Sequence, residues 1–242
     1  MSRPDYLNMK SSTSETIAMP ADAMSGDRME YSTVAVDGRK VLRNTYMLLS
    51  MTLLFSAAVA GTSMALNLPH PGLILTLVGY FGLLFAVHKT KDSAMGIVSV
   101  FGLTGFMGYT LGPILSAYAS IPGGTGIITS ALATTGLIFF GMSAWVLSTG
   151  KDLSGWGKTL MVGVLVAFVL SLGAFFFEMP ALSLAVSGLF VILMSGMIAW
   201  ETSNILHGGE SNYIMATVSL YVSLYNLFVS LLQIFGVLGS DD

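Results

Sequence analysis

The chain has 242 residues, of which 54% are hydrophobic and only 10% are charged, and its formal net charge is −3. A soluble domain usually has about 25% charged residues, so this chain has too few to cover a surface that faces water. It has no cysteine, which excludes disulfides, iron–sulfur clusters and thiol catalysis. Long apolar runs alternate with short breaks over most of its length, a pattern typical of a protein that crosses a membrane several times.

The N-terminal part differs from the rest of the chain. Residues 1–40 are rich in Ser, Thr, Met, Asp and Gly, and they contain no apolar run long enough for a signal peptide. Their lack of helical or strand periodicity predicts a flexible tail. Basic and acidic groups are nearly balanced there, so the tail is not a polybasic arm for anionic lipid.

Seven apolar segments follow, each close to the roughly 20 residues that cross about 30 Å of hydrocarbon. We place them at about 42–66, 71–88, 95–118, 126–148, 158–178, 181–203 and 213–238. Between the fifth and sixth, Glu178 and Pro180 mark a tight outer turn, because Pro disfavours helix at the preceding residue. The sequence thus predicts an all-α, polytopic membrane protein with a seven-helix domain over 41–242.

The positions of Lys and Arg predict the orientation of these segments. After the tail, basic residues occur in the breaks at 89–94 and 150–158, whereas the breaks at 67–70 and 119–125 contain none. Breaks rich in Lys and Arg stay in the cytoplasm, so we expect the N-terminus inside and, after seven crossings, the C-terminus outside. The break at 204–212 has no Lys or Arg, so only the count of crossings places it inside.

A row of glycines marks the third segment. Gly102, Gly105, Gly108 and Gly112 follow one another at steps of three and four residues, so we expect them to share a helix face. Glycine lets a neighbouring backbone approach closely, which is how membrane helices associate. Pro113 beside them predicts a kink. We interpret this face as a helix-packing surface, with a functional hinge as the alternative.

Polar residues concentrate in the last two segments. The acidic residue Glu201 lies inside the sixth segment, with Asn204 one turn further on along the same face. In the seventh segment, polar residues recur at steps of four and three: Ser219, Ser223, Asn226, Ser230 and Gln233. An acidic residue at the membrane centre costs roughly 2.5–3.5 kcal/mol on insertion scales, so it should face the bundle interior. We therefore predict a polar, proton or ion site at Glu201, Asn204, Ser223 and Asn226; interhelical hydrogen bonding is the alternative.

Four motifs in these segments are specific in combination. They are GPIL at 112–115, ETSNI at 201–205, HGGE at 207–210 and SLYVSLYNLFVSLL at 219–232. With them, the whole region after the tail resembles the Bax inhibitor-1 family, also called the transmembrane Bax-inhibitor-motif family. The resemblance implies a bundle of seven helices with the last one in the centre.

The resemblance is especially close to the proteobacterial inner-membrane branch of this family. It implies a regulatory protein that binds the membrane-anchored AAA protease FtsH and restrains its attack on other membrane proteins, in membrane-protein quality control. In an inner membrane, the outside C-terminus expected from the seven crossings would be periplasmic. A processive protease must grip a flexible end, and about 40 coil residues reach roughly 35 Å, so we expect the tail to be the gripped end and the bundle to resist extraction.

The family also suggests an alternative function, a pH-sensitive calcium, cation or proton leak channel. Some members resemble calcium channels that are closed by two acidic residues, on the sixth and seventh helices, which share one proton. The first acid matches Glu201, but the second position holds Ser223. A Glu–Ser pair cannot share a proton between two carboxylates, and it lacks the second negative charge that would attract a divalent cation.

Nothing in the sequence indicates an enzyme. His70, His88 and His207 lie at helix ends or in breaks and are not spaced like a metal motif. No pair of acids and no Ser–His arrangement is evident inside the membrane segments. We expect no catalytic residue, metal, cofactor or nucleic-acid partner, and the bilayer itself as the main environment.

Overall fold

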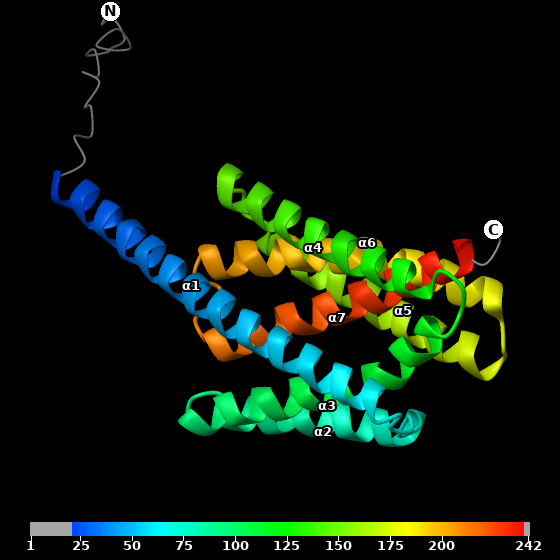
Figure 1. The fold of residues 1–242 in the computed structure, drawn as a ribbon. Helices are drawn as coiled ribbons and strands as arrows, with labels where there is room; N and C mark the ends of the chain where they lie inside the picture. Colours follow the sequence, from blue (N-terminus) through cyan, green and yellow to red (C-terminus); the bar gives the residue numbers. More distant parts are fainter. Residues whose placement is uncertain (1–20, 240–242) are drawn as a thin grey trace, which may run out of the picture.

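The computed structural model describes the backbone of residues 21–239 and the side chains of residues 38–239. Seven α-helices and one short 3-10 helix make up this part of the chain (Figure 1). They are α1 (Ala21–Ala65), α2 (Leu73–Thr90), α3 (Ala94–Ala119), α4 (Gly124–Thr149), η1 (Ser154–Trp156), α5 (Gly157–Phe176), α6 (Pro180–Leu206) and α7 (Tyr213–Leu238). The predicted all-α fold is therefore confirmed.

Each α-helix contains a stretch that is long and apolar enough to cross a membrane. These spans lie within a few residues of the seven predicted segments, because uninterrupted apolar runs of this length are easily located in a sequence. The tight turn between α5 and α6 is present as well. Pro180 occupies the start of α6, and Glu178 has a φ of 48°, which lets the chain reverse within three residues.

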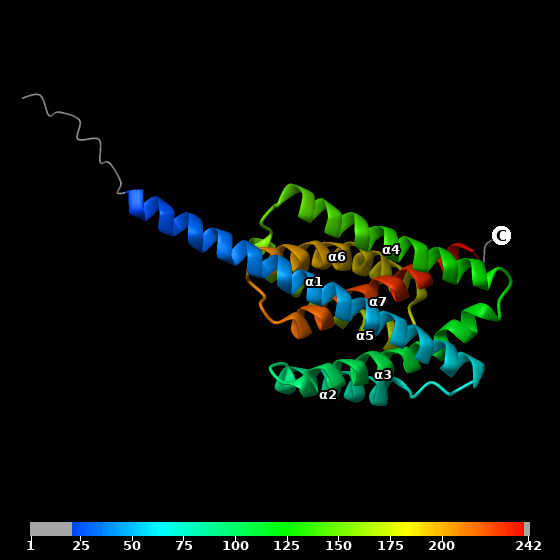
Figure 2. The same cartoon turned by 60° about the vertical axis from the view of Figure 1, so that its left-hand side comes forward.

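The first helix begins earlier than the sequence predicts. The apolar span of α1 runs over Gly38–Ala65, but the helix starts at Ala21 and extends away from the bundle (Figures 1 and 2). Residues 21–40 are thus helical, where we expected coil. They contain three Ala, two Met and two Arg, which favour helix, and lengthening an existing helix requires no new nucleus. The rest of the expected tail lies outside the described residues.

The last helix is at the centre of the bundle, as predicted. Helix α7 packs against α1, α3, α4 and α6, whereas α2 packs chiefly on α3, and α5 chiefly on α6 and η1 (Figure 1). In the most apolar 18-residue stretch of α7, 44% of the residues are buried, against 6% in the corresponding stretch of α2. The polar stripe explains this position, because polar side chains in a membrane are stabilised by partners inside a bundle.

The outer helices present a continuous apolar surface. Large side chains such as Ile74 on α2, Leu137 on α4 and Val169 on α5 are 79%, 74% and 65% exposed. In a soluble protein such a surface would promote aggregation. Here it is the surface that contacts lipid, and the chain is a multi-pass membrane protein.

The break at 204–212 lies at the same end of the bundle as the breaks that carry Lys. The Nδ2 of Asn212 donates to the backbone oxygen of Lys91 (3.1 Å) and to Oδ1 of Asp92 (2.9 Å). At the end of α6, the hydroxyl of Ser203 donates to the backbone oxygen of Lys151 (3.0 Å). The end of α6 and the break at 204–212, which has no basic residue, are thereby joined to the breaks that contain Lys91 and Lys151. The count of crossings requires these breaks to lie on one side of the membrane.

A small local structure stabilises the break after α4 at this end. The backbone N–H of Ser154 donates to Oδ1 of Asp152 at 2.9 Å. Hydrogen bonds from the backbone and side chain of Ser154, with a smaller effect of nearby His207, hold the pKa of the Asp152 carboxyl below its ordinary value. Asp152 therefore remains ionised and fixes the start of η1.

Candidate functional site

Two of the four predicted site residues meet in the core. Glu201 on α6 and Ser223 on α7 are 4% and 2% exposed. The Ser223 hydroxyl lies 3.3 and 3.4 Å from the two carboxylate oxygens of Glu201 and donates to them. Ser219, one turn earlier on α7, also interacts with this carboxylate. The acid is thus surrounded by hydroxyl groups that can only partly replace water.

The other two predicted site residues have different contacts. Asn204 lies at the end of α6, where its backbone oxygen accepts from the N–H groups of Gly209 (2.8 Å) and Glu210 (3.3 Å). The side chain of Asn226 donates to the backbone oxygen of Val222 in its own helix, at 2.8 Å. Neither is joined to the Glu201 carboxylate by a hydrogen bond among the described residues.

Most other polar side chains of α7 form hydrogen bonds between helices. Gln233 connects α7 to α6, because its Nε2 donates to Ser183 (2.6 Å) and its Oε1 accepts from Ser187 (2.7 Å). On the opposite side, the hydroxyl groups of Tyr221 and Ser56 on α1 share a hydrogen bond of 2.7 Å. These contacts supply the interhelical hydrogen bonding that the sequence left open as the alternative.

Two further contacts connect α7 with α3. The Tyr221 hydroxyl donates to the backbone oxygen of Thr104 (3.3 Å), and Tyr225 and Thr110 share a hydrogen bond of 3.3 Å. The two tyrosines stand one turn apart with ring centroids 6.4 Å from each other. The central helix is therefore fixed to its neighbours α1, α3 and α6 by side-chain hydroxyl and amide groups.

Sequence reasoning missed several polar residues beside Glu201. Thr202 shares hydrogen bonds with Tyr46 on α1 (3.3 Å) and Ser143 on α4 (3.4 Å). Ser203 accepts from the N–H of Leu153 (2.9 Å). Their position in the sequence could have indicated this, because Thr202 and Ser203 directly follow the buried Glu201. Three successive residues of a helix point in three different directions, so each of these polar side chains meets a different neighbour.

Asn212 was missed as well, although its signal was local. It precedes α7 directly, and its Oδ1 accepts from the backbone N–H groups of Ile214 (3.0 Å) and Met215 (3.2 Å). Asn is among the residues preferred at a helix N-cap. The same side chain caps α7 and joins it to the break that follows α2.

The glycines of α3 do not all face the same neighbour. A Cβ on Gly108 would overlap the backbone oxygen of Ser56, and one on Gly112 would overlap Ser63, both on α1. At Gly105 a Cβ would come within 2.9 Å of a ring carbon of Phe55, also on α1, whereas at Gly102 it would meet only Leu83 of α2, at 3.7 Å. Pro113 lies inside α3, whose last part turns toward α4 (Figure 2).

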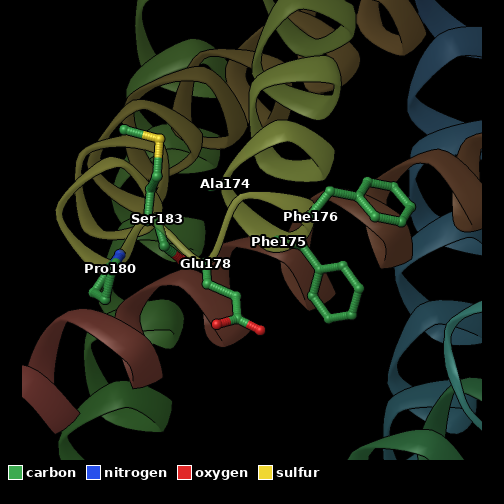
Figure 3. Close-up of a pocket in the computed structure, with 7 residues that line it drawn as sticks. Ala174, Phe175, Phe176, Glu178, Pro180 and Ser183 are labelled. Atoms are coloured by element: carbon green, nitrogen blue, oxygen red, sulfur yellow. The ribbon is translucent and has the colours of Figure 1, made fainter.

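Two cavities lie at the end of the bundle where α5 turns into α6. One, of about 530 Å³, is lined by both Glu178 and Ser183, and the Glu178 carboxylate points into it beside Phe175 (Figure 3). The other, of about 610 Å³, is lined by the beginning of α2, including Ile74, and by Phe176 of α5. Phe176 lines both cavities, so the space between α2 and α5 is hollow at this end.

The buried pair can hold or accept a proton, but it is not a metal site as it stands. Carboxylate and hydroxyl oxygens are ligands that hard cations accept, yet such cations usually need several carboxylates or carbonyls. Among the residues that the structure describes, no group of three or more His, Cys, Asp or Glu could hold a metal ion.

Comparisons with known proteins agree with the fold. A family model described as inhibitor of apoptosis-promoting Bax1 matches residues 38–240. The "Modulator of FtsH protease YccA" of Escherichia coli K12 is 54% identical over 209 residues, which are 86% of this chain and 95% of the relative. The "Inner membrane protein YccA" of E. coli O6:H1 matches equally well. An uncharacterized protein of Pseudomonas aeruginosa is 54% identical over 202 residues, 84% of this chain and 91% of its own length.

Proposed function

The chain belongs to the Bax inhibitor-1 family, and we propose that it is an inner-membrane regulatory protein that binds the AAA protease FtsH and restrains it. One observation carries this proposal: the identity of 54% to a protein named a modulator of FtsH, over 95% of that protein's length. At this identity and coverage, the two chains share one fold.

We propose a regulatory role rather than a catalytic one. The name of the relative describes modulation of another protein. Among the side chains that the structure describes, Glu201 is the one buried acid, and it is paired there with the hydroxyl of Ser223 and not with a base or a second acid. That arrangement lacks a nucleophile activated by a neighbouring base.

The N-terminal part is the element that we propose the protease grips. Residues 1–37 precede the region that the family model matches, and helix α1 extends from the bundle at this end (Figure 1). We propose that this end lies in the cytoplasm and the C-terminus in the periplasm, since the Lys-bearing breaks lie on the N-terminal side. The seven-helix bundle would then resist extraction, so the protease would be occupied.

Deletion of residues 1–35 tests this proposal in cells. We expect cells with the truncated protein to degrade membrane substrates of FtsH as fast as cells that lack this protein, because the gripped end is missing. Pulse-chase measurement of a second membrane substrate checks this. Replacement of residues 1–35 by a Gly/Ser segment of equal length is the matched control, and it should restore protection if only a flexible end is needed. Full protection by the truncated protein would contradict the role of this end.

A second candidate is a leak pathway for protons or cations through Glu201, Asn204, Ser223 and Asn226. The burial of Glu201 between α6 and α7 favours it, since an ionisable group inside a membrane is often functional. The separate contacts of Asn204 and Asn226 do not support a continuous path. Glu201→Gln should change proton or cation flux in proteoliposomes if the path exists, and flux equal to wild type would remove this candidate.

A further inference from the structure

Two neighbouring cavities lie at the end of the bundle opposite the Lys-bearing breaks, and both are open on one side. The first, of about 530 Å³, lies at the turn between α5 and α6, and the second, of about 610 Å³, lies against the start of α2. Phe176 at the end of α5 lines both of them. Each has the size of a small-molecule site, roughly 300–1,000 Å³. They are called the turn cavity and the α2 cavity below.

The two cavities reach different depths of the membrane. Glu178 stands between the apolar spans of α5 and α6, so the turn cavity lies at the level of the lipid headgroups. The α2 cavity begins near this level, at Pro71, but it continues to Val78, five residues after the span of α2 starts at Leu73. It therefore extends from the headgroup level into the hydrocarbon.

The turn cavity combines an acidic group with apolar walls. The Glu178 carboxylate points into it beside Phe175 (Figure 3). Among the described residues, no hydrogen bond or ion pair satisfies this carboxylate. A carboxylate at this level attracts a positively charged donor, and the face of an aromatic ring beside it favours an ammonium ion.

Ser183 gives the turn cavity a hydrogen-bond donor as well. Its hydroxyl accepts from Nε2 of Gln233 at 2.6 Å, but among the described residues its own hydrogen has no acceptor. Gln233 also accepts from Ser187 at 2.7 Å, so the central helix holds the Ser183 side chain in place. The turn cavity thus offers a partner for a positive group and a donor for an oxygen atom.

The α2 cavity, in contrast, is lined by apolar residues and Gly72, without a charged or hydroxyl side chain. Leu75 and Val78 of α2 form one wall, and Phe176 of α5 forms the other. Helix α2 packs chiefly on α3, and α5 chiefly on α6, so the crevice between α2 and α5 can be reached from the bilayer. Such a crevice suits a hydrocarbon chain.

We propose that the two cavities together bind one phospholipid whose headgroup carries a primary ammonium group. The ammonium group lies at Glu178, a phosphate or ester oxygen accepts from Ser183, and one acyl chain lies along α2 past Phe176. A small cation would leave the α2 cavity empty, and a wholly apolar ligand would leave the carboxylate without a partner. A phospholipid of this class satisfies both cavities. The inference goes beyond the proposed function and does not depend on the protease.

Photoreactive lipids test where the bound molecule lies. The full chain is reconstituted in vesicles of phosphatidylethanolamine and phosphatidylglycerol, and a trace of one lipid carries a diazirine on an acyl chain. We expect the phosphatidylethanolamine probe to label the peptide that contains Phe176 more strongly than the peptide that contains Phe140 of α4. The two side chains are 69% and 70% exposed, so ordinary lipid contact would label both alike. Equal labelling would overturn the site.

Substitutions at Glu178 test the role of the charge. Glu178→Gln should lower labelling at Phe176 by the phosphatidylethanolamine probe about threefold, as expected for a partly exposed ion pair. Labelling by the phosphatidylglycerol probe, which has no ammonium group, should not fall. Glu178→Asp keeps the charge and is the matched control, so it should retain the preference for phosphatidylethanolamine. Full preference in Glu178→Gln would overturn the ammonium site.

A second pair of substitutions tests the apolar walls. Phe176→Ala should lower labelling of the start of α2 by both probes, because Phe176 lines both cavities, whereas Phe140→Ala should leave it unchanged. Circular dichroism and thermal unfolding verify that the variants are folded. If Phe176→Ala does not fold, the labelling pattern of the wild type and the two Glu178 variants still decide. Purified protein and lipid suffice for every measurement, so this site can fail while the proposed function stands, and the reverse.

Discussion

At the scale of single residues, the contact between Glu201 and Ser223 determines what the core can do. The resemblance to channel-like members of the family would imply an acid at both positions, whereas this chain has the hydroxyl of Ser223 at 3.3 Å from the Glu201 carboxylate. A second carboxylate at this distance would bring two acids close enough to compete for one proton. One residue thus separates this protein from the acid-pair arrangement.

Ser223→Asp should give the protein a larger calcium leak than the wild type, because it places a second carboxylate beside Glu201 and so adds an oxygen donor and negative charge that attract a divalent cation. The measurement is calcium entry into proteoliposomes loaded with an indicator dye, with protein-free vesicles as the baseline. Ser223→Asn introduces a side chain of the same size as Asp but without its charge, so it should behave like wild type. Equal flux from Ser223→Asp and Ser223→Asn would show that charge at this position does not create a pathway.

At the scale of elements, the packing of α3 on α1 depends on glycine at particular positions. Gly108→Ala should lower the free energy of unfolding by about 1–3 kcal/mol, since its Cβ would overlap the backbone of Ser56, which cannot move aside easily. Gly102→Ala is the matched control: its Cβ would meet Leu83 at 3.7 Å, an ordinary contact, so stability should stay equal or rise slightly. Unfolding in mixed micelles with increasing SDS measures both, and equal stability of the two variants would contradict this account of the packing.

The same helix shows what could and could not be predicted from sequence. Apolar runs of about 20 residues locate the spans almost directly, since the bilayer sets their length. Which neighbouring helix a residue faces is harder to predict. A step of three residues is shorter than a full helical turn of 3.6 residues, and this difference accumulates along the helix. Gly102 consequently faces α2, while Gly108 faces α1. Hydrogen-bond partners such as those of Asn226 could not be predicted at all, because its own backbone competes with every neighbouring helix.

At the scale of the whole molecule, the two ends of the bundle differ in charge and in structure. One end holds Lys91 and Lys151 and is joined by hydrogen bonds of Asn212 and Ser203. The other end holds the turn at Glu178 and the two cavities. Seven spans place the ends of the described chain on opposite sides of the membrane, and the basic end should face the cytoplasm.

Reporter fusions test this orientation directly. Alkaline phosphatase, which is active only in the periplasm, should be active when fused after Asp242 and inactive when fused after Gly209, in the break that lacks Lys and Arg. Green fluorescent protein at the same two sites should give the opposite result. The Gly209 fusion is the more demanding one, because hydrogen bonds rather than charge place this break beside Lys91 and Lys151. Phosphatase activity at Gly209 would mean that the six helices before it do not return the chain to the cytoplasm, and the proposed orientation of the bundle would then be wrong.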